Sequence, residues 1–211
     1  MNALILVDLQ NDFLPGGALA VSRGDEVIKI ANRLMPRFDA VVATRDYHPP
    51  NHLSFASEHP GRSVGDCVNV DGLDQILWPV HCVEGTRGSD FSSELNTGLI
   101  TKVFSKGIDR RRDSYSGFFD NGGIVSTGLG EYLQRTGVSE VYVMGLATDF
   151  CVRATATDAV RLGLTTYLIE DGCRGVDLHP GDCERAISEL EQSGVHRVES
   201  RQVPVRSQGK A

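Results

Sequence analysis

The chain has 211 residues, of which 40% are hydrophobic and 23% are charged, and its formal net charge is −7. These values fit a compact domain, and the negative charge argues against nucleic acid or an anionic membrane as the main partner. No apolar stretch approaches the ~20 residues that a membrane span requires. The first residues lack the basic region of a secretory signal, so we expect a cytoplasmic protein. Five cysteines without a CxxC spacing predict free thiols there.

Strand and helix patterns alternate from the first residues onward. Residues 3–7 form a continuous apolar run, typical of a strand buried on both faces. Residues 24–35 place their apolar side chains on one helical face, and residues 40–43 form a second apolar strand. The following segment, 47–98, is rich in Gly, Pro, Asn and Ser. Its length indicates a functional loop region.

The same alternation continues to the end of the chain. It predicts strands at residues 99–104, 141–144, 166–169 and 195–198, and helices at 128–135, from near Cys151 and from Pro180. Such alternation predicts an α/β fold of three layers, with a mostly parallel central sheet and helices on both faces. We expect one domain over residues 1–211, with a polar tail after about residue 201 that is typical of a disordered terminus.

Polar or reactive side chains stand where four of the predicted strands end, namely Asp8, Asp46, Lys106 and Cys151. Ligands of such folds bind beyond the carboxyl ends of the strands, so these residues could converge on one rim. Alone, Asp8 reads as a turn residue, Lys106 as a surface lysine and Cys151 as a small packing residue. Together, a carboxylate, an ammonium and a thiol at a helix N-terminus form a set for nucleophilic catalysis.

A carboxylate and two imidazoles follow the second strand closely in Asp46-Tyr-His48-Pro-Pro-Asn-His52. His81, in the segment Trp-Pro-Val-His-Cys, is the candidate that completes the group. Carboxylate and imidazole ligands without thiolates suit Zn²⁺, Fe²⁺ or Mn²⁺. The alternative is a polar loop whose histidines cap backbone groups. The pattern favours one divalent metal ion, with Zn²⁺ as the first candidate.

These motifs together resemble the nicotinamidase/pyrazinamidase family of isochorismatase-like cysteine hydrolases. The matching segments are VDLQNDF at 7–13, RDYHPPNHLSFA at 45–56, WPVHCV at 78–83, KG at 106–107, DSYSGFF at 113–119 and GLATDFCVR at 145–153. They cover most of the chain. The metal-binding cluster separates this family from metal-free relatives that share the Asp, Lys and Cys.

The resemblance implies a role for each matching residue. Asp8, Lys106 and Cys151 match the catalytic set. Asp46, His48 and His81 match the metal ligands, and His52 matches a further ligand that only some members have. Phe13, Trp78 and Tyr115 match aromatic residues that enclose a pyridine ring.

Two further features of the family concern the loop before the cysteine. A cis peptide bond at Leu146–Ala147 would aim the N–H of Ala147, with that of Cys151, at an oxyanion. Phe150 departs from the histidine or tyrosine that many members carry at this position.

The implied activity is the hydrolysis of nicotinamide to nicotinate and ammonia through a thioester, a step of NAD salvage, with pyrazinamide also accepted. The partner would be this small substrate, and a homo-oligomer is compatible with the sequence. Another carboxamide or ureido hydrolase of the superfamily is the alternative within enzymes, and lack of metal would favour it. A non-catalytic, metal-stabilised binding protein is the alternative outside them, and its Cys151 would react with iodoacetamide no faster than a free thiol.

Overall fold

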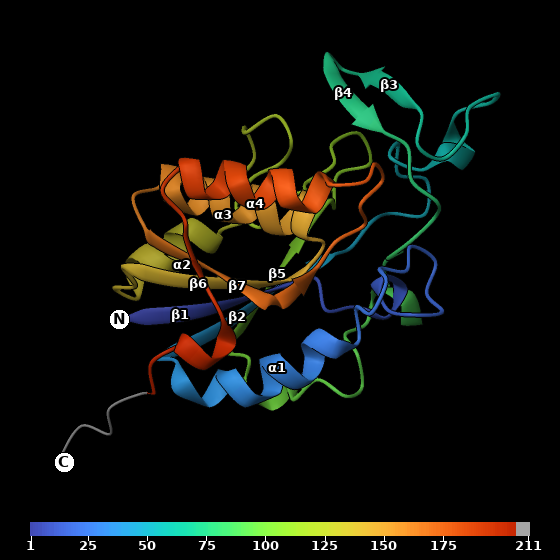
Figure 1. Cartoon of the computed structure of the whole chain (residues 1–211). Coiled ribbons are helices and arrows are strands. Elements are labelled where there is room, and N and C mark those ends of the chain that lie inside the picture. The colour runs from blue at the N-terminus through green and yellow to red at the C-terminus, as the bar shows by residue number, and fades with distance from the viewer. Residues whose placement is uncertain (206–211) are drawn as a thin grey trace.

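The computed structural model describes residues 1–205, and its centre is a six-stranded parallel sheet (Figure 1). The strand order is β5-β2-β1-β6-β7-β8. The strands are β1 (Asn2–Val7), β2 (Ala40–Asp46), β5 (Lys102–Lys106), β6 (Glu140–Leu146), β7 (Thr165–Arg174) and β8 (His196–Val198). The run from Ala3 to Val7 in β1 is fully buried, which explains why it reads as a continuous apolar segment.

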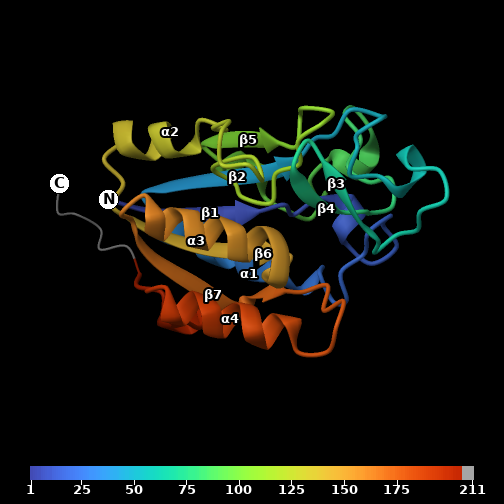
Figure 2. The same cartoon turned by 90° about the horizontal axis from the view of Figure 1, so that it is seen from above.

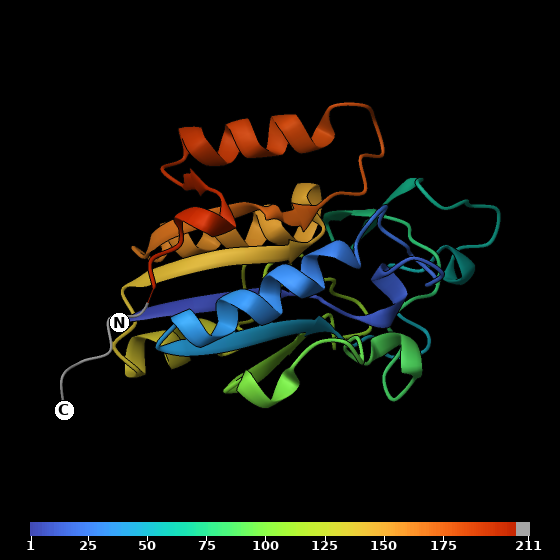
Figure 3. The same cartoon turned by 60° about the horizontal axis from the view of Figure 1, so that its bottom comes forward.

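Helices cover both faces of this sheet, which confirms the predicted three-layer α/β fold. They are α1 (Glu26–Leu34), α2 (Leu129–Arg135), α3 (Arg153–Arg161) and α4 (Asp182–Gln192). Helix α1 lies on one face, and α3 with α4 lies on the other (Figures 1 and 3). Among the described residues, no helix is long and apolar enough to cross a membrane.

The strand order reverses between β1 and β6, since the chain adds β2 and β5 on one side and β7 and β8 on the other. In parallel α/β sheets, ligands bind outside the carboxyl ends of the strands at such a switch point. Asp8 directly follows β1, and Cys151 lies a few residues after β6. The topology alone therefore brings these two residues to the same crevice.

The long segment predicted as irregular contains a small two-stranded sheet that the sequence patterns did not reveal. It is the antiparallel hairpin of β3 (Cys67–Val70) and β4 (Leu73–Ile76). Figure 2 shows the carboxyl ends of β2 and β5 pointing toward the part of the molecule that holds this hairpin. The strands are short and only two of their eight residues are buried, so they lack the clear alternation that would identify them.

Several predicted boundaries shift in the structure. Strands β2 and β5 extend to Asp46 and Lys106, so both residues end strands instead of following them. Residues Thr97–Leu99 form a 3-10 turn before β5. The predicted disordered tail falls largely on residues 206–211, which lie outside the described residues. Before them, Ser200–Gln202 forms a short 3-10 turn.

Candidate active site and metal centre

Lys106 is the hub of a buried polar cluster at the carboxyl ends of the strands. Its Nζ lies 2.9 Å from Asp8 Oδ2, 2.5 Å from Asp46 Oδ1 and 3.3 Å from Cys151 Sγ, and it donates to the carbonyl oxygen of Ser114 at 2.9 Å. The Lys106 side chain is fully buried. The structure thus brings together the three residues that the sequence suggested for catalysis, although they are far apart in the chain.

The local backbone explains how Asp8 and Cys151 reach this cluster. Asp8 has a φ of 52°, so the chain turns sharply out of β1 at this residue. Aspartate tolerates this left-handed conformation better than most residues do. On β6, Gly145 has a φ of 131°, and a Cβ there would lie 2.1 Å from the carbonyl oxygen of Val7. Only glycine therefore lets β6 run this close to β1 just before the cysteine loop.

Burial sets the protonation states of the thiol centre. It raises the pKa of the Cys151 thiol well above its ordinary value, and the nearby ammonium of Lys106 does not offset this effect. Burial also raises the pKa of Asp8. Burial alone would lower the pKa of Lys106, but Asp46 and Asp8 raise it well above its ordinary value. These shifts favour a protonated thiol at Cys151 and a charged ammonium at Lys106, next to a carboxyl group at Asp8 whose pKa is raised.

The cysteine lies in a single π-helical turn, Thr148–Val152, which leads into α3. The sequence placed it near the start of an α-helix, whereas α3 begins two residues later, at Arg153. The Leu146–Ala147 peptide bond is cis, as expected. Ala147 and Cys151 line the same pocket.

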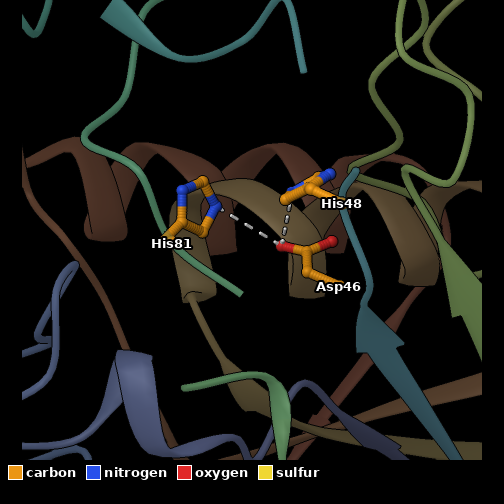
Figure 4. Close-up of side chains that lie close together, drawn as sticks. All are labelled: Asp46, His48 and His81. Atoms are coloured by element: carbon orange, nitrogen blue, oxygen red, sulfur yellow. Dashed lines mark ion pairs between the residues drawn. The ribbon is translucent and has the colours of Figure 1, made fainter. Parts of the chain in front are cut away.

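Asp46, His48 and His81 form a second buried cluster that shares Asp46 with the first. One ligand atom from each of the three lies within 4.8 Å of the others. Both histidine Nε2 atoms face Asp46 Oδ2 at 3.8 Å, as Figure 4 shows. These separations exceed a hydrogen bond, and the three atoms converge on a common point.

The hydrogen bonds behind this cluster fit a metal site. Nδ1 of His48 lies 2.8 Å from the carbonyl oxygen of Gly107, and Nδ1 of His81 lies 2.8 Å from that of Pro79. A carbonyl oxygen only accepts, so each Nδ1 carries a proton, and Nε2 is the ring nitrogen that is left to bind a metal ion. Burial lowers the pKa of His81 to about 4, which favours its neutral form. Two carboxyl groups facing one ammonium also favour an added cation.

The structure places His52 beside this group and not within it. Its ring centroid lies 4.4 Å from that of His48. Its Nδ1 lies 2.7 Å from Ser54 Oγ, and its Nε2 faces the carbonyl oxygen of Arg112 at 3.4 Å. His52 forms a separate group with His48 and Asp113. A ligand role for His52 stays a prediction.

The three aromatic residues suggested for ring binding line the pocket that also contains Cys151, Asp46 and His81. Trp78 Nε1 donates a hydrogen bond to the hydroxyl of Tyr115 at 3.1 Å. Phe13 packs its ring 5.6 Å from that of His81. The pocket therefore joins a flat apolar slot to the thiol on one side and to the histidines on the other.

Sequence reasoning missed several residues of this pocket, namely Leu19, Asp113 and Val176. Phe150, noted only as a departure from the resembling family, also lines it. The Phe150 ring meets Trp78 edge-on at 5.0 Å between centroids and tilts against Tyr115 at 5.5 Å. Its apolar ring thus closes the slot where a polar side chain would offer a hydrogen bond. Leu19 and Val176 belong to no quoted motif, whereas Asp113 begins the matching segment at 113–119, which could have suggested it.

The parallel six-stranded sheet with helices on both faces is the α/β fold of isochorismatase-like hydrolases. Residues 2–202 match the isochorismatase domain, so the chain belongs to the isochorismatase family. The nicotinamidase of Escherichia coli (strain K12) is 47% identical, over 91% of this chain and 92% of that protein.

Solved structures agree with this assignment. A nicotinamidase pyrazinamidase of Acinetobacter baumanii superposes with a TM-score of 0.93 at 44% identity, covering 96% of this chain and 98% of that one. A pyrazinamidase of Pyrococcus horikoshii, solved in complex with zinc, gives a TM-score of 0.76 at 39% identity, covering 94% and 98%.

Proposed function

We propose that this protein hydrolyses nicotinamide to nicotinate and ammonia, and that it also accepts pyrazinamide. The observation that carries the proposal is the position of Lys106, whose Nζ contacts Asp8, Asp46 and Cys151 at once. This contact links a thiol and its base to the cluster of histidines. The similarity to nicotinamidases over more than nine-tenths of the chain supports the same conclusion.

In the proposed reaction, Asp8 accepts the proton of Cys151 as the sulfur attacks the carboxamide carbon of the substrate. Lys106 stays protonated, and its positive charge stabilises the Asp8 carboxylate before the proton transfer and the Cys151 thiolate after it. The N–H groups of Ala147 and Cys151 bind the oxyanion. Protonated Asp8 then gives its proton to the leaving nitrogen, so ammonia departs and a thioester remains. Water hydrolyses the thioester to nicotinate, and the thiol is restored.

The histidine cluster would bind and orient the substrate. Asp46, His48 and His81 would hold one divalent ion, which would supply a Lewis acid for binding the ring nitrogen. Zn²⁺ is the first candidate, given the ligand types and the similarity to a zinc-containing pyrazinamidase. Phe13, Trp78 and Tyr115 would enclose the ring. A location in the cytoplasm and any association between copies of the chain stay predictions of the sequence.

The test compares nicotinamide with benzamide, which has the same carboxamide and ring shape but no ring nitrogen. Aromatic packing treats the two alike, whereas a site built around a polar contact strongly rejects an analogue that lacks it. We expect kcat/KM, measured by ammonia release, to fall by ~10²-fold or more for benzamide. Removal of the metal by a chelator should abolish most of the activity.

Three outcomes would count against parts of this proposal. Equal kcat/KM for nicotinamide and benzamide in the metal-loaded protein would show that no ion contacts the ring nitrogen. Absence of both bound metal and nicotinamide hydrolysis would favour a different carboxamide or ureido hydrolase. A Cys151 that reacts with iodoacetamide no faster than a free thiol, in a protein without amidase activity, would favour a binding protein.

A further inference from the structure

Asp46 is the one residue that belongs to both clusters. Its Oδ1 pairs with Lys106 at 2.5 Å, while its Oδ2 faces Nε2 of His48 and of His81 at 3.8 Å. This carboxylate therefore lies between the histidines and the thiol centre and contributes to both. Hydrogen bonds that hold the Asp46 backbone in place therefore also help to set the position of its carboxylate between the two centres.

The backbone of Asp46 has a strand neighbour on only one side. There it pairs in register with Lys106 of β5, and the N–H of Tyr47 donates to the Lys106 carbonyl at 3.0 Å. On the other side, the pairing of β2 with β1 ends at Leu6 and Ala43. Because the chain turns away at Asp8, β1 does not continue beside Asp46 on that side, and no other strand among residues 1–205 takes its place. Its N–H and C=O there need other partners, since buried backbone groups are costly when unpaired.

The side chain of Gln10 supplies both partners. The backbone N–H of Asp46 donates to Gln10 Oε1 at 2.7 Å, and Gln10 Nε2 donates to the Asp46 carbonyl at 2.7 Å. The second hydrogen of Nε2 goes to the carbonyl oxygen of Ser89 at 2.9 Å. Gln10 is fully buried. A primary amide carries the same donor and acceptor as a peptide group, so it reproduces the hydrogen bonds of a missing strand.

We propose that Gln10 is a positioning residue of this site, which stands in for a strand beside β2 and fixes the Asp46 carboxylate between the two centres. Its chemistry explains why an amide occupies this position. Glutamate has the length and the acceptor but no donor, and methionine has the length but neither group. The inference rests on the proposed function only in that Asp46 is taken as a metal ligand. It concerns no atom of the substrate.

The test measures zinc affinity and turnover in Gln10→Met and Gln10→Glu. We expect the Zn²⁺ dissociation constant, measured by competition with a chromogenic chelator, to rise ~10- to 100-fold, the range for residues that orient metal ligands. With zinc saturating, kcat should still fall on the order of 10-fold, because Asp46 also orients Lys106. Gln10→Glu retains the acceptor for the Asp46 N–H, so it serves if the methionine variant does not fold.

Thr166→Val is the matched control. Thr166 is also buried, and its hydroxyl donates to the Leu164 carbonyl at 3.0 Å near the start of β7, away from the site. This near-isosteric change removes one internal hydrogen bond and should leave the zinc dissociation constant within twofold of the parent value. If a folded Gln10 variant also keeps its zinc dissociation constant within twofold of the parent value, and keeps the parent kcat, the inference is wrong. Because zinc affinity is measured without substrate, failure to hydrolyse nicotinamide would overturn the proposed function and leave this comparison intact.

Discussion

The thiol centre and the histidine centre lie side by side, yet different forces hold them in place. Lys106 ends β5 in register with Asp46, Asp8 directly follows β1, and Cys151 lies in the π-helical turn that follows β6, so all three are held close to paired strands. His48 and His81 come from loops, where a single hydrogen bond donated by Nδ1 to a backbone carbonyl oxygen orients each ring. Damage to the thiol centre should therefore change chemistry without changing the fold, whereas damage to the loops should change binding first. The following variants test this difference.

The largest effect is expected for Cys151→Ala. The substitution removes the nucleophile but touches no member of the histidine cluster. We expect turnover to fall on the order of 10⁴-fold or more, as for other catalytic nucleophiles, while zinc content stays that of the parent. Ammonia release and metal analysis of the same sample measure both quantities.

Cys173→Ala is the control for this variant, because Cys173 is also a buried free thiol but lies on β7. It should keep most of the activity. Normal ammonia release by folded Cys151→Ala would rule out covalent catalysis by this residue. Loss of zinc in Cys151→Ala would show that metal binding by the histidine centre depends on the thiol centre, contrary to this expectation.

Asp8→Asn should have the next largest effect, because it keeps the side-chain shape but removes the proton acceptor. We expect kcat/KM for nicotinamide to fall at least ~10²-fold, at the lower end of general acid–base contributions. The dissociation constant for zinc should change little, since the Asp8 carboxylate contacts Thr44 and Lys106 and is not one of the three residues of the histidine cluster. A variant with full activity would require another base for Cys151.

The two centres also differ in how well the sequence predicted them. Lys106 and Asp46 stand just past two predicted strands, and parallel strands align their carboxyl ends, so these positions suggested that the two residues meet. The sequence could not show that β2 extends as far as Asp46 and ends there beside Lys106. That register depends on pairing between strands about 60 residues apart, which local patterns do not encode.

The positions of the loop residues could be predicted less well from the sequence. His81 entered as a candidate from its short motif, and its role came from family resemblance. Its position depends on contacts across long stretches of chain, such as the bond from the N–H of Cys82 to Asp12 Oδ2 at 2.7 Å. The hairpin of β3 and β4 was missed altogether. Gln75 of β4 donates to Asp113 Oδ2 at 3.1 Å, so even this outlying hairpin contributes to the wall of the pocket.

A smaller and more specific effect is expected for Thr44→Val, which sharpens the account of the thiol centre. Thr44 Oγ1 donates to Asp8 Oδ1 at 2.7 Å, and this bond lowers the pKa of Asp8 against the larger effect of burial, which raises it. Asp8 must be ionised to accept the proton, so activity is lost as the pH falls through its pKa. The acid limb of kcat/KM should therefore lie above the ordinary value of 3.8 in the parent.

Loss of the Thr44 bond should move this limb to higher pH, because the ionised form of Asp8 loses a donor. Activity well above the limb should change only a few-fold, since the remaining contacts of Asp8 stay in place. The measurement is a pH profile of kcat/KM for both proteins. A limb that shifts to lower pH, or does not shift, would mean that Asp8 does not control it.

The smallest effect is expected for Tyr115→Phe, which tests the slot without disturbing either centre. The ring of Tyr115 lines the pocket, and its hydroxyl accepts the bond from Trp78 Nε1 at 3.1 Å. Phenylalanine keeps the ring and removes only this bond, at a cost of about 1 kcal/mol. Because this bond joins two rings that line the slot, we expect its loss to weaken substrate binding. KM for nicotinamide should then rise about fivefold, by the usual conversion of free energy into an equilibrium constant, while kcat stays close to the parent value.

Steady-state kinetics separate the two parameters. A fall in kcat with unchanged KM would instead place Tyr115 with the reacting groups, and the division between a chemical centre and a binding slot would fail at this residue.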